Sequence, residues 1–460
     1  MNNIIENNIS LFTSFEGVEG FFMLFLGLHK KNAVLLQLKK KMHLISGMRK
    51  LVLLFCLILT SACGQESAEG MPGNGGGNAE DSAVTFETTS IGANFNENIQ
   101  EIAGVYNELN ATGTEYIRSF INITPYLKRN TAGITGINTN AVAMSTLPAQ
   151  FVAVKTQVPK AKLVLSIKIV FKNLPGEVPS KGSEGVRHVI DCVLQLLEKD
   201  NLGNSIDVLV LGNEPMWENG ENVANPVNYA DFVAAFASAA SSWRVSKGWN
   251  YKIFAGALNR VSVQDSINAN VGAIIDAASA SPDIDGLDIH LHNSEVEECE
   301  ASLKVVREKY MFTKQLMCSE LSMVWKLNKL MNTKLGSWGP DHGYSSTMKR
   351  YEWLNQASAK ALNGTPVSSE EFLSFFMDGI PDYPRNWFTT YYDAFLKYDV
   401  SFVTPRFSAV ESDEVYTAGS TMWALGAIFS ARFLGRAADG SMNPSPLMFP
   451  EVKAARLRKK

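Results

Sequence analysis

The sequence predicts an α/β fold in which parallel strands alternate with helices. From residue 88 onward, short apolar runs rich in β-branched residues alternate with longer segments of helical periodicity, the pattern of a parallel sheet with crossover helices. The clearest run is residues 208–211, which stops at Gly212-Asn213-Glu214-Pro215. A strand of this composition is buried on both faces. The chain therefore carries a carboxylate at the C-terminal end of a buried strand.

Strands and helices can be assigned in order on the same criteria. Strands 1 and 2 are expected at residues 89–95 and 116–122, with a helix at 98–109 between them, and strand 3 at 162–171. The helix at 185–197 has its apolar residues at the spacing of one buried face. Strand 4 is 208–211. The remaining expected elements are a helix at 229–245, strand 5 at 252–258, a helix within 263–279, strand 6 at 286–293, strand 7 at 315–320, strand 8 at 400–405 and a helix at 421–434.

Eight expected strands over residues 88–440, with helices among them, predict a (β/α)8 TIM barrel. In such a barrel the C-terminal strand ends converge on one mouth, where active sites lie. Glu214 ends strand 4 and Glu320 ends strand 7. The simplest alternative is that Glu214 caps the following helix, but the second strand-end carboxylate favours a catalytic pair.

These two glutamates carry a resemblance to a known family. Asn213-Glu214-Pro215 resembles the acid/base motif of the clan A glycoside hydrolases, which also place a nucleophilic glutamate after strand 7, as Glu320 is placed here. The resemblance covers roughly residues 88–440. It implies Glu214 as acid/base and Glu320 as nucleophile in retaining hydrolysis. It also implies that Asn213 binds the sugar 2-hydroxyl and that Arg118, on strand 2, supports the nucleophile.

Strand 6 carries three polar residues at alternate positions. Asp288, His290 and His292 share one face of the strand. The clan often has His-x-Tyr here, so that in His290-Leu-His292 a second histidine stands where tyrosine is usual. A metal site is disfavoured, because these three residues are spread over ~13 Å at ~3.3 Å per residue. On strand 7, alternation places Cys318 on the same face as Glu320, directly beneath it.

A long insertion is expected between strands 7 and 8, because nearly eighty residues separate them and βα loops are usually short. Much of it is expected to cover the active face. It contains a glycine-rich stretch around Trp338. Trp338 and Trp217, three residues after Glu214, are candidate platforms for sugar rings, although a packing role is equally consistent with either tryptophan.

The N-terminal residues form a separate region. Met48-Arg49-Lys50, an apolar stretch and small residues before Cys63 resemble a bacterial lipoprotein signal at 48–62 with a lipidated Cys63. Residues 1–47 are interpreted as an upstream start-site artefact, 63–87 as the lipidated cysteine and a flexible tether, and 441–460 as a C-terminal tail, of which the basic end at 453–460 is expected to be frayed and solvated. A transmembrane anchor is the alternative, but the apolar stretches are shorter than the ~20 residues a span requires.

Composition narrows the range of partners. The formal net charge is −4, which argues against nucleic acid as a partner. Cys192, Cys299 and Cys318 lack the paired spacing of a metal set or disulfide framework. They are expected to be buried thiols, and a disulfide between two of them is the alternative. No metal and no organic cofactor is expected.

These observations predict a lipid-anchored enzyme of the bacterial cell envelope that hydrolyses β-linked polysaccharide or oligosaccharide with retention. Its partners would be the glycan and, through the lipid, a membrane. Two alternatives remain: a non-catalytic glycan-binding lipoprotein on the same fold, and a transglycosylase that uses the same glutamates. The sugar, the linkage and the choice between endo and exo cleavage are open.

Overall fold

The computed structural model of the protein describes residues 88–171, 182–218, 226–265 and 269–458. The expected start-site segment (1–47), the signal (48–62) and the tether with Cys63 (63–87) lie outside the described residues and stay predictions. Within the described ranges, we find no helix that is both long enough and apolar enough to cross a membrane.

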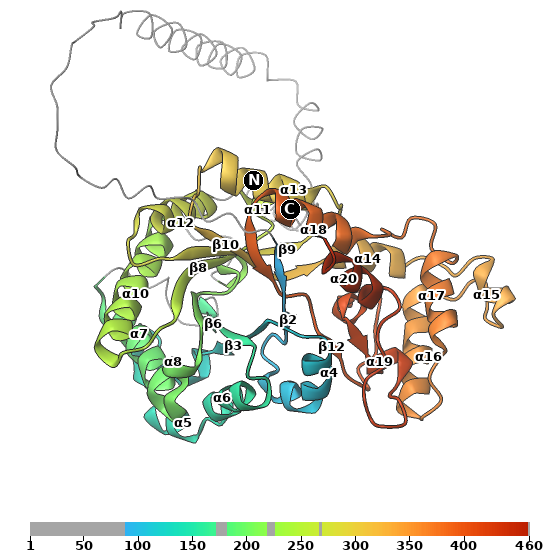
Figure 1. Ribbon diagram of the computed structural model, residues 1–460, viewed down its shortest axis with the longest axis horizontal. Coiled ribbons are helices and arrows are strands. Elements are labelled where there is room, and N and C mark those ends of the chain that lie inside the picture. Colours follow the sequence, from blue (N-terminus) through green and yellow to red (C-terminus); the bar gives the residue numbers. More distant parts are fainter. Residues whose placement is uncertain (1–87, 172–181, 219–225, 266–268, 459–460) are drawn as a thin grey trace, which may run out of the picture. The chain divides into compact units, whose positions relative to one another are not determined.

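The described chain is built around one parallel sheet of nine strands in the order β1-β11-β10-β9-β8-β7-β6-β3-β2 (Figure 1). Every neighbouring pair for which register is recorded in this sheet runs parallel. The strands are β1 Ser90–Ile91, β2 Ala93–Asn94, β3 Tyr116–Asn122, β6 Lys162–Lys168, β7 Val208–Leu211, β8 Lys252–Asn259, β9 Gly286–His292, β10 Gln315–Ser322 and β11 Val400–Val403.

The sheet closes on itself because β1 and β2 are two halves of one strand. β1 pairs with β11, and β2 pairs with β3. Gly92 joins the halves, and its N–H donates to the Val403 carbonyl at 2.8 Å. A Cβ on Gly92 would lie 2.3 Å from the Tyr116 carbonyl oxygen, so only glycine fits there without a shift. The nine strands therefore occupy eight positions, which confirms the predicted (β/α)8 barrel.

Apolar side chains fill the barrel on both sides of its wall. Inside, a cluster is formed by Val164, Val208, Val210, Phe254, Met317 and Phe402. The ring of Tyr116 stacks on that of Phe402, with 3.9 Å between centroids. Outside, the alternate strand residues pack against the surrounding helices in one continuous core. The barrel interior is thus filled by apolar side chains. The polar residues pack above them, nearer the C-terminal ends of the strands.

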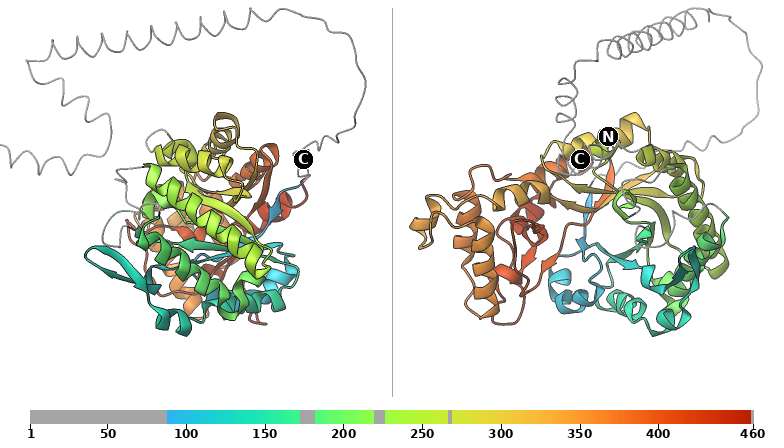
Figure 2. Two further views of the ribbon diagram at one scale, coloured as in Figure 1. Left: turned by 90° about the vertical axis from the view of Figure 1, so that its left-hand side faces the viewer. Right: turned by 180° about the vertical axis from the view of Figure 1, so that it is seen from behind.

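Helices surround the strands, as predicted; Figures 1 and 2 show α7, α10 and α12 along the outside of the barrel. The helices that precede β10 include η1 Ile99–Val105, α4 Tyr106–Ala111, α5 Thr139–Met144, α6 Leu147–Gln157, α7 Glu184–Glu198, α8 Leu202–Ser205, α9 Pro215–Glu218, α10 Pro226–Lys247, α11 Val261–Gln264, α12 Ala269–Ala280 and α13 Glu298–Lys304. A hairpin of β4 Leu127–Asn130 and β5 Gly133–Ile137 follows β3 and packs on α7.

The predicted insertion between strands 7 and 8 is helical. It comprises α14 Val324–Met331, α15 Trp338–Asp341, α16 Arg350–Leu362 and α17 Ser369–Met377. The next helix, α18 Trp387–Lys397, packs on α13 and β11 and is the crossover helix of the barrel itself. Figures 1 and 2 show α16 and α17 beside the barrel, where α16 packs on α19 Ala431–Leu434. The insertion therefore forms a lateral helical unit, whereas the sequence had suggested a cover over the active face.

The helix expected at residues 421–434 was a wrong prediction. This segment consists of a 3-10 turn, η6 Trp423–Gly426, the strand β13 Phe429–Ser430 and the single turn α19. β13 pairs in parallel with β12 Ser408–Ala409. The Phe429 N–H donates to the Phe407 carbonyl at 2.9 Å. Pairing with a strand about twenty residues earlier thus outweighs the local helical pattern. Such pairing cannot be recognised from one segment of sequence alone.

The C-terminal tail expected at 441–460 also differs from the structure, because a helix, α20 Met448–Ala455, docks there on α18. Met448, Val452 and Ala455 are buried at helical spacing. The Glu451 carboxylate accepts hydrogen bonds from the Phe388 and Thr389 N–H groups at the start of α18 (2.8 and 3.1 Å). The barrel unit therefore continues past residue 440.

The docking of α20 gives a stability prediction. Met448 has no exposed surface, so Met448→Ala is expected to lower the free energy of unfolding by about 2–4 kcal/mol through loss of burial and a residual cavity. Met144, which is 82% exposed, offers the matched control: Met144→Ala should change it by less than about 0.5 kcal/mol. Denaturant unfolding of both variants tests this, and equal effects would contradict the docked helix.

Candidate active site

Glu214 stands on a tight turn that follows β7. Its backbone has φ 44°, in the left-handed region that residues other than glycine occupy infrequently. The Glu214 N–H donates to the Ala257 carbonyl (3.0 Å), and the Glu214 carbonyl accepts from the Trp217 N–H (2.9 Å). At Gly212, φ is 135°, and a Cβ would lie 2.3 Å from the Gly256 carbonyl oxygen. Close contact with β8 thus fixes the turn that carries the Glu214 carboxylate.

Glu320 reaches the barrel interior through a β-bulge in β10. Met317 pairs with Asp288 and Glu320 pairs with His290, so three steps along β10 match two along β9. Cys318 consequently belongs to the core outside the barrel wall, whereas Met317 lies inside. The prediction that Cys318 lies beneath Glu320 on the same face was wrong, because simple alternation does not hold across a bulge.

Arg118 links the two strand-end motifs. Its side chain is fully buried. Its Nη1 donates to Glu320 Oε1 at 2.5 Å and its Nη2 to Asn213 Oδ1 at 2.7 Å. Further hydrogen bonds to Asn94 Oδ1 and Ser166 Oγ, both at 3.1 Å, hold the guanidinium in place. The structure thus brings Arg118, Asn213 and Glu320 together as the sequence predicted.

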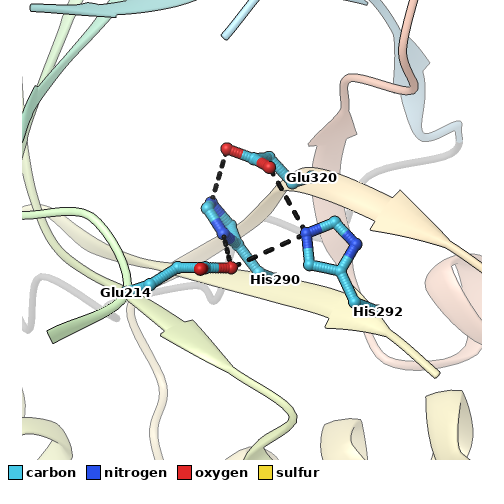
Figure 3. Close-up of side chains that lie close together, drawn as sticks. All are labelled: Glu214, His290, His292 and Glu320. Atoms are coloured by element: carbon cyan, nitrogen blue, oxygen red, sulfur yellow. Dashed lines mark hydrogen bonds and ion pairs between the residues drawn. The ribbon is translucent and has the colours of Figure 1, made fainter. Parts of the chain in front are cut away.

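The two histidines of β9 lie between the two glutamates, as Figure 3 shows. His290 Nδ1 is 3.0 Å from Glu214 Oε1. His292 Nε2 is 3.3 Å from Glu320 Oε2 and 3.6 Å from Glu214 Oε1. The predicted alternation of β9 is confirmed, since both imidazoles point inward while Leu287, Ile289 and Leu291 join the outer core.

In each imidazole, a serine hydroxyl group holds the ring nitrogen opposite the one that contacts Glu214 or Glu320. Ser319 donates its hydroxyl hydrogen to Asp288 Oδ2 (2.5 Å), so its oxygen is left to accept from the His290 Nε2–H (3.0 Å). We infer this tautomer from the hydrogen-bond network. The other nitrogen, Nδ1, then shares one proton with the Glu214 carboxyl group. His292 Nδ1 lies 2.9 Å from Ser322 Oγ, which holds the second imidazole in place.

The electrostatic environment separates the two glutamates. Burial opposes ionisation of Glu320, but the charges of His290 and Arg118 and a hydrogen bond from His292 together hold the pKa of Glu320 well below its ordinary value. Burial acts against the charged form of His290, yet Glu320, Glu214 and Asp288 raise the pKa of His290 above its usual range. Negative charge is therefore favoured on Glu320, and a proton is retained beside Glu214.

The distance between the carboxylates limits the chemistry. One oxygen of Glu214 and one of Glu320 lie within 4.8 Å of each other. Retaining glycoside hydrolysis uses carboxyl groups about 5–5.5 Å apart, whereas the inverting reaction needs about 6.5–9.5 Å to admit a water molecule. The observed spacing suits direct attack by one carboxylate on a substrate atom while the other handles a proton.

The same four side chains meet the donor requirements of a metal site. Glu214, His290, His292 and Glu320 each offer one ligand atom, and these atoms all lie within 4.8 Å of one another. The spacing along β9 disfavours a metal bound by Asp288 and the two histidines. The cluster in the structure instead combines the histidines with two glutamates from other parts of the chain.

The two predicted tryptophan platforms differ in exposure. Trp217 on α9 is 37% exposed and stays a candidate. Trp338 is only 5% exposed, its indole N–H donates to Ser374 Oγ (3.1 Å), and its ring stacks on His342 with 4.1 Å between centroids. Trp338 therefore packs within the helical insertion and lacks the exposed face that a sugar platform needs, so that prediction was wrong.

Sequence reasoning missed a tryptophan that does reach the site. Trp423 is 37% exposed, and its ring lies edge-on to His292 with 4.8 Å between centroids. The ring centroid of Trp325, at the start of the insertion, lies 6.3 Å from that of Trp423. Trp423 was overlooked because residues 421–434 had been assigned to an outer helix. Ser319 and Ser322, which hold the imidazoles, were missed as well.

Comparison with known proteins identifies no family for the chain. No protein-family model and no curated protein sequence matches it. Among solved structures, the chain is similar to the endo-beta1,6-glucanase BT3312 (13% identity, 81% of this chain and 76% of that chain, TM-score 0.44). It is also similar to the exo-beta-1,4-mannosidase Op5Man5 from Opitutaceae bacterium strain TAV5 (12% identity, 82% of this chain and 62% of that chain, TM-score 0.46).

A third similar structure is a GH10 endoxylanase retrieved from a sugarcane soil metagenome (11% identity, 80% of this chain and 97% of that chain, TM-score 0.44). By their names these three proteins are glycoside hydrolases. All three TM-scores lie below 0.5, so the function of this chain has to be argued from its own site.

Proposed function

We propose that the protein is a retaining glycoside hydrolase that acts on β-linked polysaccharide or oligosaccharide. The observation that carries the proposal is the pair of strand-end glutamates, whose nearest oxygens lie within 4.8 Å and whose surroundings differ. Arg118 donates to Glu320 at 2.5 Å, whereas Glu214 contacts the proton-bearing His290 at 3.0 Å. This asymmetry supports Glu320 as nucleophile and Glu214 as acid/base.

The proposed reaction is a double displacement. An oxygen of Glu320 attacks the anomeric carbon while Glu214 gives its proton to the departing glycosidic oxygen, so the C–O bond breaks and a glycosyl ester forms. Glu214 then takes a proton from water, whose oxygen attacks the same carbon and frees Glu320. Asn213, oriented by Arg118, is proposed to hydrogen-bond the sugar 2-hydroxyl.

A substrate screen tests this proposal. The purified protein and its Glu320→Gln variant would be incubated with defined β-glucans, xylans, mannans, galactans and algal polysaccharides. We expect sugar release by the native protein alone, with product size separating endo from exo cleavage. Binding without release would favour a glycan-binding protein, and products longer than the substrate would favour a transglycosylase.

Trp423 is proposed as a platform for a sugar ring next to the glutamates, since its exposed ring adjoins His292. Trp423→Ala is expected to lower kcat/KM roughly 10- to 100-fold through loss of stacking. Trp338→Phe is the matched control, because Trp338 is buried in the insertion. It should reduce thermal stability while leaving kcat/KM within about two-fold. The reverse result in steady-state kinetics would refute the platform.

We also propose that Cys63 carries a lipid that anchors the enzyme in the bacterial cell envelope. The support comes from the basic, apolar and small-residue pattern of 48–63. Metabolic labelling with a lipid precursor should mark the native protein and not Cys63→Ala. Equal labelling of both would exclude this anchor.

A further inference from the structure

Glu214, His290, His292 and Glu320, here termed the carboxylate–imidazole cluster, have the spacing of a metal coordination sphere. The closest donor pairs are separated by 3.0 Å (His290 Nδ1 to Glu214 Oε1), 3.3 Å (His292 Nε2 to Glu320 Oε2) and 3.6 Å (His292 Nε2 to Glu214 Oε1). In a tetrahedral zinc site with bonds of about 2.0–2.2 Å, neighbouring donors lie roughly 3.3–3.5 Å apart. Small side-chain movements would therefore suffice to enclose an ion.

The groups behind the imidazoles also match those of a metal site. A histidine that binds a metal through one nitrogen is normally held through the other by a hydrogen bond. His290 Nε2 is 3.0 Å from Ser319 Oγ, and His292 Nδ1 is 2.9 Å from Ser322 Oγ. Both nitrogens that face the glutamates are thus oriented in advance by fixed partners on β10.

Arg118 does not block this arrangement. It contacts Glu320 through Oε1 at 2.5 Å, whereas the oxygen that faces His292 is Oε2. An ion bound to Oε2 would leave the Arg118 contact in place. The nearby guanidinium charge repels a cation, so we expect weaker affinity than in a dedicated structural zinc site.

We propose that the carboxylate–imidazole cluster binds one divalent transition-metal ion of the Zn²⁺ class, and that this ion inhibits the enzyme by bridging its two catalytic glutamates. The inhibition rests on the proposed function, but the binding site does not. Two nitrogen donors select Zn²⁺ or Cu²⁺ over Mg²⁺ and Ca²⁺, which prefer oxygen ligands. The bound ion occupies the lone pairs with which Glu320 attacks and Glu214 accepts its proton, so inhibition should be competitive with substrate.

Binding can be measured without any substrate. The purified protein, treated with EDTA and dialysed, would be titrated with ZnCl₂ in a calorimeter, and its Tm followed with and without the ion. We expect one ion per chain and a higher Tm with ZnCl₂, but no shift with MgCl₂ at the same concentration. Co²⁺ should give visible absorption bands of a site with nitrogen ligands.

His292→Gln is expected to weaken Zn²⁺ binding at least ten-fold, with His188→Gln as the matched control, because His188 lies on α7 outside the cluster. If His292→Gln does not fold, as judged by its circular dichroism, Glu214→Gln on the turn after β7 replaces it. Equal Zn²⁺ binding by the native protein and the cluster variant would overturn the proposal, since the ion would then be bound elsewhere.

Activity separates this inference from the proposed function. Saturating ZnCl₂ should lower glycoside hydrolysis at least ten-fold, and EDTA should restore it. One-to-one binding that requires His292, in a protein with no hydrolytic activity, would support the metal site and count against the hydrolase. Faster hydrolysis with Zn²⁺ would overturn inhibition and point to a metal-dependent reaction instead.

Discussion

Glu320→Ala is expected to lower kcat/KM for β-glycosides by at least about four orders of magnitude, the scale on which loss of a covalent nucleophile acts in other hydrolases. The carboxylate lies against Arg118 and His292, which keep it ionised. No other carboxylate among the described residues shares this pair of contacts. Alanine leaves a small space where an external anion can enter. Azide should therefore restore turnover of an activated aryl glycoside.

The product of that rescue identifies the role of Glu320. Azide would attack the substrate directly from the side that Glu320 occupied, so a β-glycoside should give an α-glycosyl azide, distinguishable by NMR. Glu295→Ala provides the control, because the Glu295 side chain is 55% exposed and pairs with Lys326 at the surface; it should keep native kinetics. Full activity of Glu320→Ala, or a β-glycosyl azide, would contradict the assignment.

Most of the barrel could be predicted because short strand segments rich in apolar residues alternate with helical segments along the chain. The segment at 208–211 is apolar throughout, and its boundaries in the structure are those predicted. Glu214 and Glu320 were recognised for a related reason: in a parallel barrel, residues at the C-terminal strand ends converge on one mouth whatever their separation in sequence. Asn213 belongs to that same set of strand ends, whereas Arg118 lies within β3 and was identified through the family resemblance.

Other features depend on contacts between distant residues, which a local pattern does not encode. The bulge in β10 adds one residue against β9, and this moves Cys318 out of the barrel. Pairing of β12 with β13 takes the place of the expected last helix. Because Trp423 lies in that segment, its position next to the active site could not be predicted. Trp338, in a glycine-rich stretch, had the local features of an exposed loop residue. Its burial by Trp353 and Phe375 became evident only from the structure.

The metal-binding capacity of the site illustrates the same limit. His290 and His292 lie two residues apart on one face of a strand, and Asp288 is the third polar residue on that face. In the folded chain Asp288 contacts Ser319, while the carboxylates nearest the imidazoles come from β10 and from the turn after β7. A ligand set assembled from three segments cannot be recognised from spacing within one of them.

Glu214→Ala is expected to have an effect that depends on the leaving group, unlike Glu320→Ala. Protonation by a general acid contributes about 10²- to 10⁴-fold, so substrates with poor leaving groups should lose that factor in kcat/KM. A dinitrophenyl glycoside needs no proton to depart and should still form the glycosyl ester. Hydrolysis of the ester lacks its general base, so the ester should accumulate, with a pre-steady-state burst and a low KM.

Azide provides the decisive comparison between the two glutamates. In Glu214→Ala it should attack the glycosyl ester on Glu320 and give a β-glycosyl azide from a β-glycoside, the opposite configuration to that expected for Glu320→Ala. The contact between His290 Nδ1 and Glu214 Oε1 at 3.0 Å adds a second test. In the proposed reaction Glu214 donates a proton, and His290 holds a proton beside it. His290→Phe should therefore lower kcat most for the substrates that need protonation. If the configurations of the two azides were exchanged, the roles of Glu214 and Glu320 would be the reverse of those proposed.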